Sequence, residues 1–419
     1  MTWLIVITLL IALILLGQPL FVIIGSLTAG CYYFISEEPV SIVIGDIFYA
    51  ANKEILLAIP LFVLAGQIMT KGSISTRLIK IMTTATAAIP AGLAMASVLS
   101  CAIFAAISGS SPVTLIAIGS ILYPALREAG YDKKLSIGML SVGGTLGIIV
   151  PPSIPMIIFA IMASVSVVDL FKAGIGPSIL LIGLLSIYAF IRAPKTARGT
   201  FNLKEFLHAL KDGVFALMMP VVILGGIYTG FFTATESAAI AVLYALLVEL
   251  FIHREMKLKN FPVVFVETAE LLGTLFLILI LAVSLNKFMT FEDIPQTLVD
   301  SMSAMISSKV TFLLVINLLL LIVGCIMDIM SAILVLAPIL TPMAIHYGID
   351  PIHFGIIMIV NLEIGYITPP IGINLFVASG IFKENLSTVI KSIVPLIFVL
   401  LIGLLLISFI PSISLFTVG

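Results

Sequence analysis

The stretch Gly-Gly-Thr-Leu-Gly-Ile-Ile-Val-Pro-Pro-Ser-Ile-Pro at residues 143–155 interrupts a long apolar segment of the chain. It places three glycines and three prolines where a helix would otherwise continue. Glycine weakens a helix, and proline removes a hydrogen-bond donor and clashes with the preceding turn. We therefore predict that the helix breaks at Pro151.

A second copy of this pattern lies at 363–374, as Glu-Ile-Gly-Tyr-Ile-Thr-Pro-Pro-Ile-Gly-Ile-Asn. Gly147 and Gly365 are 218 positions apart, and the two Pro-Pro pairs have the same separation. An ungapped alignment of 124–152 with 342–370 is identical at 8 of 29 positions, namely Pro124, Gly130, Asp132, Val142, Gly147, Ile149, Pro151 and Pro152. We interpret this as an internal repeat. Broken apolar segments at matching positions in two halves indicate the binding site of a transporter.

The composition places the chain in a membrane. Hydrophobic residues make up 61% and charged residues only 10%, whereas soluble domains carry about 25% charged residues. The apolar runs are about 15–40 residues long, and a spanning helix needs roughly 20. No strand-length segment alternates at period two, which argues against a barrel. We predict an all-α polytopic membrane protein.

Several function classes are excluded or disfavoured. The net charge of −1 gives no sign of a nucleic-acid partner. The three cysteines lie in apolar segments without metal-ligand spacing. Phosphate-binding, zinc-hydrolase and nucleophile-elbow motifs are absent from the sequence, so we expect neither an enzyme nor an organic cofactor. ATP is then not the energy source unless a partner supplies it.

The charge-free segments predict the helices. Residues 81–126 and 310–345 are each longer than one membrane crossing requires. The first carries turn residues near its middle and the second a single charge, so we expect two helical hairpins. Residues 2–35 form one tilted span or two short ones, and 36–54 suit an interfacial helix. The broken helices occupy 135–167 and 354–382. Other spans are expected at about 55–70, 174–191 and 392–411, and residues 213–252 should form two passes. A further span should end near Leu285. Thr233-Ala-Thr-Glu236 has the pattern of a capping box that opens a helix.

Loop charges indicate that the repeat is inverted. Residues 71–80 hold three basic side chains and no acidic one, whereas the matching 286–300 hold Lys287 against Glu292, Asp293 and Asp300. Basic loops remain in the cytoplasm. The two halves should therefore cross the membrane in opposite directions.

The chemistry is expected where helices break. A half-helix that ends at Val150 directs carbonyl oxygens toward a cation, and one that begins after Pro152 directs its positive dipole end toward an anion. Hydroxyls and carbonyls are ligands that Na⁺ accepts. We predict one Na⁺ site from Ser108, Ser110, Ser111, Thr145, Gly147 and Val150. A second site would use Gly324, Asp328, Ser331, Gly365, Thr368 and Pro369. An anionic substrate between the tips would reach Ser111, Ser153, Asn361 and Asn374.

Two acidic residues stand out within apolar segments. A carboxylate in mid-membrane costs at least ~2.5 kcal/mol, which favours a functional role for Asp328 over a helix cap or a neutral buried acid. Glu363 lies next to the second break, where capping, a structural contact and a polar role all remain open.

At these residues the sequence resembles the large membrane subunit (M subunit) of the tripartite ATP-independent periplasmic, or TRAP, transporters. The resemblance covers almost the whole chain and rests on a combination of motifs, which are Ser-Gly-Ser-Ser-Pro-Val-Thr at 108–114, Gly-Tyr-Asp at 130–132, Gly-Ile-Ile-Val-Pro-Pro-Ser at 147–153, Gly-Phe-Phe-Thr-Ala-Thr-Glu-Ser-Ala-Ala at 230–239, Asp328, and Gly-Tyr-Ile-Thr-Pro-Pro-Ile-Gly-Ile-Asn-Leu-Phe at 365–376.

The resemblance implies a Na⁺-driven elevator-type importer of organic acids in a bacterial inner membrane. Its partners would be a separate small four-helix membrane subunit and a soluble periplasmic substrate-binding protein. By analogy, 81–191 and 304–419 would form the moving transport domain, and 1–80 and 192–303 the scaffold that holds the small subunit.

Alternatives remain at this stage. A stand-alone Na⁺/dicarboxylate symporter of the related hairpin-containing class would fit the same helices. A channel or a membrane scaffold is a second alternative, which the paired breaks and the inverted repeat disfavour. Within the importer interpretation, C4-dicarboxylates, sialic acids and other sugar or keto acids all suit an anion at a half-helix terminus.

Overall fold

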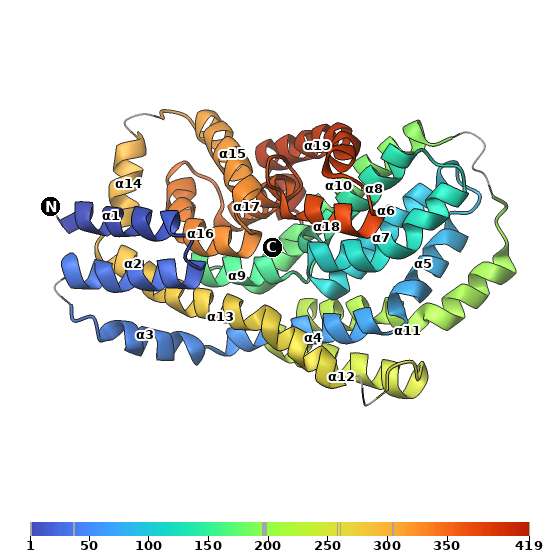
Figure 1. The fold of residues 1–419 in the computed structure, drawn as a ribbon, viewed down its shortest axis with the longest axis horizontal. Helices are drawn as coiled ribbons and strands as arrows, with labels where there is room; N and C mark the ends of the chain where they lie inside the picture. The colour runs from blue at the N-terminus through green and yellow to red at the C-terminus, as the bar shows by residue number, and fades with distance from the viewer. Residues whose placement is uncertain are drawn as a thin grey trace.

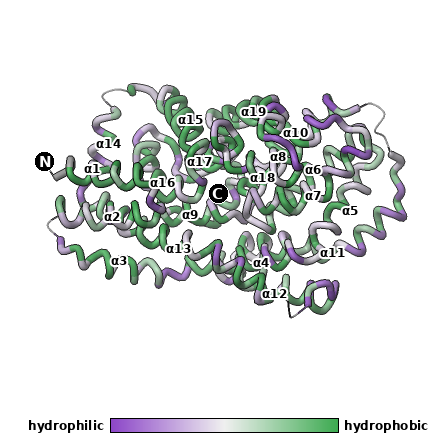
Figure 2. The backbone as a smooth tube through the Cα atoms, viewed as in Figure 1, coloured by the Kyte–Doolittle hydropathy of each residue, from purple (hydrophilic) through white to green (hydrophobic). Residues whose placement is uncertain are grey.

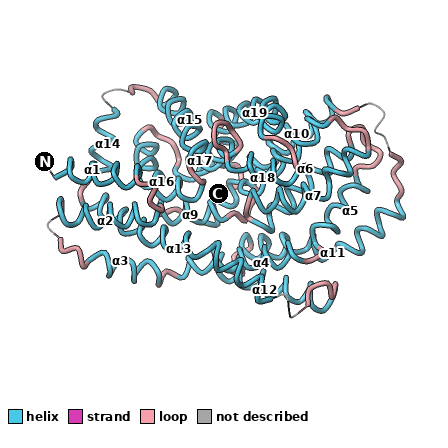
Figure 3. The backbone as a smooth tube through the Cα atoms, in the orientation of Figure 1, coloured by secondary structure: helices cyan, strands magenta, loops and turns pink. Residues whose placement is uncertain are grey.

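The chain folds as a bundle of helices in the computed structural model (Figure 1). The structure describes residues 2–36, 38–194, 199–257, 259, 261–303 and 306–418, and no strand occurs within these ranges (Figure 3). Within them, eight helices are long and apolar enough to cross a membrane, or nine spans if one bent pair is counted as a span. Apolar residues cover most of the helices, and hydrophilic residues gather in loops and near helix ends (Figure 2). The predicted all-α polytopic membrane fold is confirmed.

The N-terminal part consists of short helices. Its elements are α1 (Thr2–Leu15), α2 (Leu20–Phe34), α3 (Ile42–Ala51), the 3-10 turn η1 (Glu54–Leu57), α4 (Ala58–Lys71) and α5 (Ile74–Ala85). Residues 2–35 are therefore two helices, which turn at Gly17, where φ is +64°. At ~1.5 Å per residue each of these helices is shorter than a ~30 Å hydrocarbon core. The predicted helix within 36–54 is α3, and its Asp46 is buried and paired with Lys287 at 2.6 Å.

The two predicted hairpins are present and match each other in register. Their arms are α6 (Gly92–Ser108), α7 (Ser111–Glu128), α15 (Lys309–Ile326) and α16 (Ile329–His346). The outgoing arms α7 and α16 begin at aligned positions of the sequence repeat, and they also end at aligned positions. In Figure 1 the first hairpin lies toward the right end of the molecule and the second toward the left. The inversion of the repeat stays a prediction.

The broken helices form the centre of the molecule. Their halves are α8 (Lys133–Ile149), α9 (Ile154–Ala163), α17 (Pro351–Tyr366) and α18 (Ile373–Phe382). The halves α8 and α9 are bent by 41° at the predicted break. Asp132 and Asp350, a repeat-related pair, cap α8 and α17 with side-chain carboxylates. Every residue from Leu135 to Ile149 and from His353 to Tyr366 is buried, so protein surrounds both helices on all sides.

The remaining long helices flank this centre. They are α10 (Val167–Arg192), α11 (Leu203–Tyr228), α12 (Ala234–Leu247) with a π turn η2 (Val248–Ile252), α13 (Phe261–Phe291), α14 (Ile294–Ser303), α19 (Leu386–Phe409) and the short α20 (Ser412–Leu415). The capping box at Thr233 and Glu236 is formed as predicted, with both reciprocal hydrogen bonds. The predicted division into 1–80, 81–191, 192–303 and 304–419 stays a prediction.

Candidate functional site

The tip of the first hairpin is a tight turn rich in hydroxyl groups. α6 ends at Ser108, and Gly109 adopts φ +57°, a left-handed conformation that costs glycine little. The hydroxyls of Ser108 and Thr114 lie 2.7 Å apart. The Thr114 hydroxyl also donates to the carbonyl of Ser110 at 2.9 Å. These bonds hold the turn in a defined shape and leave the Ser110 side chain at its apex.

The first broken helix touches this turn at Gly147. A Cβ atom on Gly147 would lie 2.7 Å from the carbonyl oxygen of Ser110 and 2.8 Å from the hydroxyl of Thr114. The predicted Na⁺ ligands Ser108, Ser110 and Gly147 are therefore neighbours. Thr145 is buried, and its hydroxyl donates to the carbonyl of Val142 at 2.6 Å, within its own helix.

The second broken helix also packs closely on its hairpin, but against the incoming arm α15 and not against the tip. A Cβ atom on Gly365 would lie 2.7 Å from the backbone of Gly324, and one on Gly324 would lie 2.7 Å from the carbonyl of Leu362. At the tip, the Asp328 carboxylate accepts a hydrogen bond from the Ser331 N–H at 3.0 Å and caps α16. The Thr368 hydroxyl donates to the carbonyl of Ile364 at 2.6 Å. Pro369 follows directly and forms the break with Pro370.

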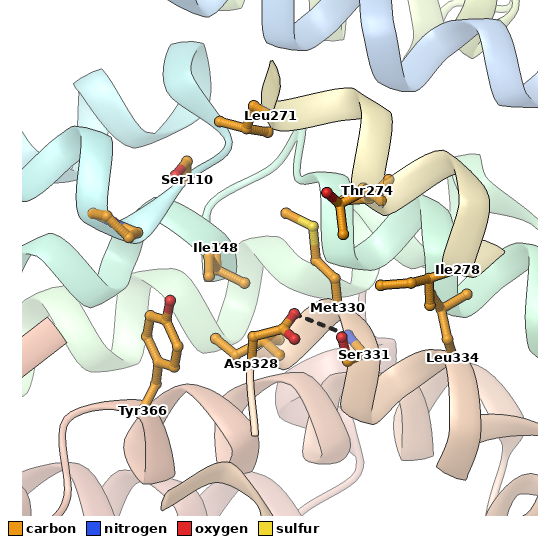
Figure 4. A pocket seen from close by; sticks show the side chains of 13 residues that line it. Ser110, Ile148, Leu271, Thr274, Ile278, Asp328, Met330, Ser331, Leu334 and Tyr366 are labelled. Carbon is orange, nitrogen blue, oxygen red and sulfur yellow. Dashed lines mark hydrogen bonds between the residues drawn. The ribbon is translucent and has the colours of Figure 1, made fainter. Parts of the chain in front are cut away.

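A cavity of about 290 Å³ lies between the two tips and α13 (Figure 4). Ser110 and Asp328, which occupy equivalent positions in the repeat, both line it, as does Ser331. Leu271, Leu275 and Ile278 of α13 form an apolar wall on one side, with Thr274 among them. Tyr366, next to Gly365, extends its hydroxyl toward the space between the tips in Figure 4. The cavity thus has an apolar wall and a few polar groups, as small-molecule sites commonly do.

Sequence reasoning missed Thr274 and Tyr366. Tyr366 lies within the second Gly/Pro stretch, so its place beside the break was a usable signal. Thr274 sits in an apolar span with no local feature that distinguishes it, and only the packing of α13 against the tips reveals it.

The four predicted substrate residues lie elsewhere. Ser111, Ser153, Asn361 and Asn374 are all buried, and none is among the described residues that line the cavity. The Asn361 amide donates to Asn317 Oδ1 of α15 at 2.5 Å, and the Asn374 amide donates to the hydroxyl of Ser111. The Ser153 hydroxyl has no hydrogen-bond partner among the described residues. These substrate assignments, like the Na⁺ ligands, stay predictions.

Within the described residues, no group of three or more His, Cys, Asp or Glu side chains could hold a metal ion. The oxygens at the tips are instead hydroxyls, backbone carbonyls and one carboxylate. Such hard oxygen donors suit a weakly held alkali cation better than a tightly bound transition metal.

Comparison with known proteins identifies the chain's relatives. The family described as "Tripartite ATP-independent periplasmic transporter, DctM component" matches residues 7–413. The chain is 37% identical to the C4-dicarboxylate TRAP transporter large permease protein DctM of Rhodobacter capsulatus, over 99% of this chain and 98% of that one. It is 38% identical to the isethionate TRAP transporter permease protein DctMQ of Oleidesulfovibrio alaskensis, where it covers 97% of itself but 65% of the relative's length.

A solved structure shares the fold. The Alcanivorax borkumensis YdaH transporter superimposes with a TM-score of 0.65 over 88% of this chain and 86% of that one, at 14% sequence identity. At that identity the likeness shows the fold alone. The match over nearly the whole chain and the full-length relatives establish the family: the chain belongs to the DctM, or large permease, component of the tripartite ATP-independent periplasmic transporters.

Proposed function

We propose that the chain imports a small organic acid anion and couples this transport to Na⁺. Relatives are named for a C4-dicarboxylate and for isethionate, both small organic anions. The proposal extends this chemistry to the present chain. The observation that carries it is the cavity between the two tips, which the repeat-related Ser110 and Asp328 both line.

The charges around the cavity favour a co-transported cation. Among the described residues that line it, the one charged group is the carboxylate of Asp328, and no lysine or arginine is present. Two like charges 4 Å apart repel by about 4 kcal/mol at an effective dielectric constant of 20. An anionic substrate therefore needs positive charge that the lining does not supply. Na⁺ at the hairpin tips, held by hydroxyl, carbonyl and carboxylate oxygens, would provide it.

The helix termini support the same assignment. The outgoing arms α7 and α16 begin at the two tips, beside the cavity. Their N-terminal dipole ends favour negative charge, while the carbonyls at the ends of α6, α8, α15 and α17 favour a cation. The close approach of Gly147 to the Ser110 carbonyl places the first tip beside the first broken helix, as an ion held by both would require.

The wall of the cavity supports an elevator mechanism. The α13 side chains that face the cavity are mostly apolar, and an apolar face can slide past the tips without breaking strong hydrogen bonds. We propose that the hairpins and broken helices move as one body against a scaffold that includes α13. The small membrane subunit would bind this scaffold, and a periplasmic binding protein would deliver the substrate at a bacterial inner membrane.

The test uses proteoliposomes that hold this chain and its small membrane subunit, with and without an inward Na⁺ gradient and the cognate binding protein. Asp328→Asn keeps an N-cap residue for α16 but removes the charge. We expect Na⁺-driven uptake to fall by about tenfold or more, equivalent to ~1.4 kcal/mol or more. The matched control is Asp350→Asn, which changes a capping carboxylate of α17 outside the cavity and should leave uptake near that of wild type.

The outcomes separate the proposal from its alternatives. Uptake that needs both the Na⁺ gradient and the binding protein supports a tripartite importer. Uptake with Na⁺ alone would indicate a stand-alone symporter, and non-saturable flux would indicate a channel. Full uptake by Asp328→Asn would remove Asp328 from the coupling site.

A further inference from the structure

One hydroxyl on the wall of the cavity differs from the others on its helix. The helix α13 carries three threonines, at 268, 274 and 290. The hydroxyls of Thr268 and Thr290 each donate to the carbonyl four residues earlier, at 2.7 and 2.9 Å. Thr274 lines the cavity, and its hydroxyl makes no hydrogen bond to a described residue. Figure 4 shows its oxygen on the side of the cavity, where it is available to a bound molecule.

Three more hydroxyls around the same space are also free. Ser110 and Ser331 lie at the two tips, and Tyr366 ends the first half of the second broken helix. All three line the cavity, and their hydroxyls make no hydrogen bond to a described residue. By contrast, the hydroxyls of Ser108 and Thr114 bond to each other within the first tip. Since each free hydroxyl can donate one hydrogen bond, the four together suit a ligand with several acceptor oxygens.

The charge of the lining limits what this ligand can be. Asp328 is the one charged group among the described residues that line the cavity, and the α13 wall is apolar apart from Thr274. A carboxylate or sulfonate group can accept hydrogen bonds from neutral hydroxyls. A second negative charge on the same molecule would meet either the Asp328 carboxylate or the apolar wall, and both are unfavourable. The lining therefore suits one anionic group on a short apolar body.

We propose that the cavity takes a singly charged oxyanion with a short apolar body, and that Thr274 helps to select it by donating a hydrogen bond. The inference rests on the proposed import function and narrows its substrate class to monocarboxylates and monosulfonates. Thr274 is the one polar side chain that α13 contributes to the described lining.

The position of Thr274 gives its hydrogen bond a particular role. Ser110, Ser331 and Tyr366 belong to the predicted moving group, so they would travel with the substrate. Thr274 belongs to the predicted scaffold and would stay behind. Its hydrogen bond would therefore strengthen binding in the present conformation alone, and would be lost when the substrate moves away from α13.

Direct binding tests the substrate class without transport. The chain and its small membrane subunit, in lipid nanodiscs and in the presence of Na⁺, would be titrated by calorimetry with three probes. Butyrate and propane-1-sulfonate carry one charge, and succinate has the carbon number of butyrate but two charges. We expect at least one singly charged probe to bind about tenfold or more tightly than succinate, a difference of ~1.4 kcal/mol or more.

Substitutions on α13 test the role of Thr274. Thr274→Val keeps the size of the side chain but removes the hydroxyl. It should weaken binding of the singly charged probe by about tenfold or more, as expected for loss of a hydrogen bond to a charged group. Thr274→Ser keeps the hydroxyl and should bind nearly as wild type does. The matched control is Thr268→Val, because the Thr268 hydroxyl is bonded within its own helix and lies outside the described lining. It should leave binding unchanged.

The outcomes distinguish this inference from the proposed function. Succinate binding that equals or exceeds that of both singly charged probes would overturn the substrate class and leave Na⁺-coupled import standing. Equal binding by folded Thr274→Val and Thr268→Val proteins would overturn the role of Thr274. Absence of Na⁺-dependent binding for all three probes would overturn the inference and contradict anion import through this cavity as well.

Discussion

At the scale of single residues, the contacts between the hairpins and the broken helices depend on the absence of a side chain. Gly147 and Gly365 approach the backbone of the hairpins so closely that a Cβ atom would lie 2.7 Å from Ser110 O or from the Gly324 backbone. Backbone atoms cannot give way as the end of a flexible side chain can. These two glycines therefore define how near the broken helices come to the hairpins.

Gly147→Ala should separate the first tip from its broken helix. We expect the substitution to destabilise the protein by about 1–3 kcal/mol, because it overpacks a tight contact, and to reduce Na⁺-driven uptake. Gly183→Ala in α10 is the matched control: nothing lies within 4 Å of its Cβ position. There, alanine should be neutral or stabilise the helix by up to about 1 kcal/mol. Thermal unfolding and uptake measure both, and equal behaviour of the two variants would refute the steric argument.

At the scale of elements, an ion pair attaches α3 to α13. The Asp46 carboxylate is buried, with 7% of its side chain exposed, and lies 2.6 Å from the Lys287 ammonium group. It also accepts a hydrogen bond from the Ser284 hydroxyl at 3.0 Å. This polar contact lies on the inward face of α3, beside the buried Val43 and Ala50, whereas Ile44 and Phe48 are exposed.

Lys287→Met should destabilise the packing of α3. Loss of the partner of a fully buried charge costs about 3–5 kcal/mol, and we expect about 2 kcal/mol here because 45% of the Lys287 side chain is exposed. The double variant Asp46→Asn/Lys287→Met should regain most of this loss. Lys71→Met is the control, since its pair with Glu267 is exposed on both sides and is worth about 0–1 kcal/mol. Unfolding midpoints distinguish these cases, and equal losses at both lysines would contradict the role of burial.

At the scale of the whole molecule, the predicted moving group meets the predicted scaffold across α13. Beside the apolar cavity wall, the Asn286 amide of α13 donates to the carbonyl of Met162, at the end of α9, at 3.3 Å. Such single hydrogen bonds are modest in net free energy, about 0.5–1.5 kcal/mol. The elevator movement that we propose would have to break this hydrogen bond.

A covalent link across this interface should stop transport. We expect a short thiol-reactive cross-linker between Met162→Cys and Asn286→Cys to arrest uptake, in a chain whose three buried native cysteines are replaced. The control pair Gly25→Cys/Leu281→Cys joins α2 to α13 inside the predicted scaffold, where the side chain of Leu281 lies 3.3 Å from the Cβ position of Gly25. Cross-linking that pair should leave uptake intact. Normal transport with the first link in place would exclude relative motion at this interface.

Local patterns in the sequence predicted where helices break, turn and begin. These features act through their own backbone and their nearest neighbours in the chain, so a local pattern predicts them. They are the prolines at 151 and 369, the turn at 108–112 and the capping box at 233–236. The same holds for the internal repeat and for the membrane class, which depend on the order and the proportion of apolar residues.

The partner of each polar side chain, by contrast, depends on the tertiary structure. The sequence predicted that Asn361 and Asn374 reach a substrate, but packing gives them Asn317 and Ser111 as partners. Thr274 reaches the cavity because a distant span packs against the tips. A side chain near a helix break can face any of several neighbouring elements. The choice among them depends on contacts between residues far apart in the chain, which no local pattern records.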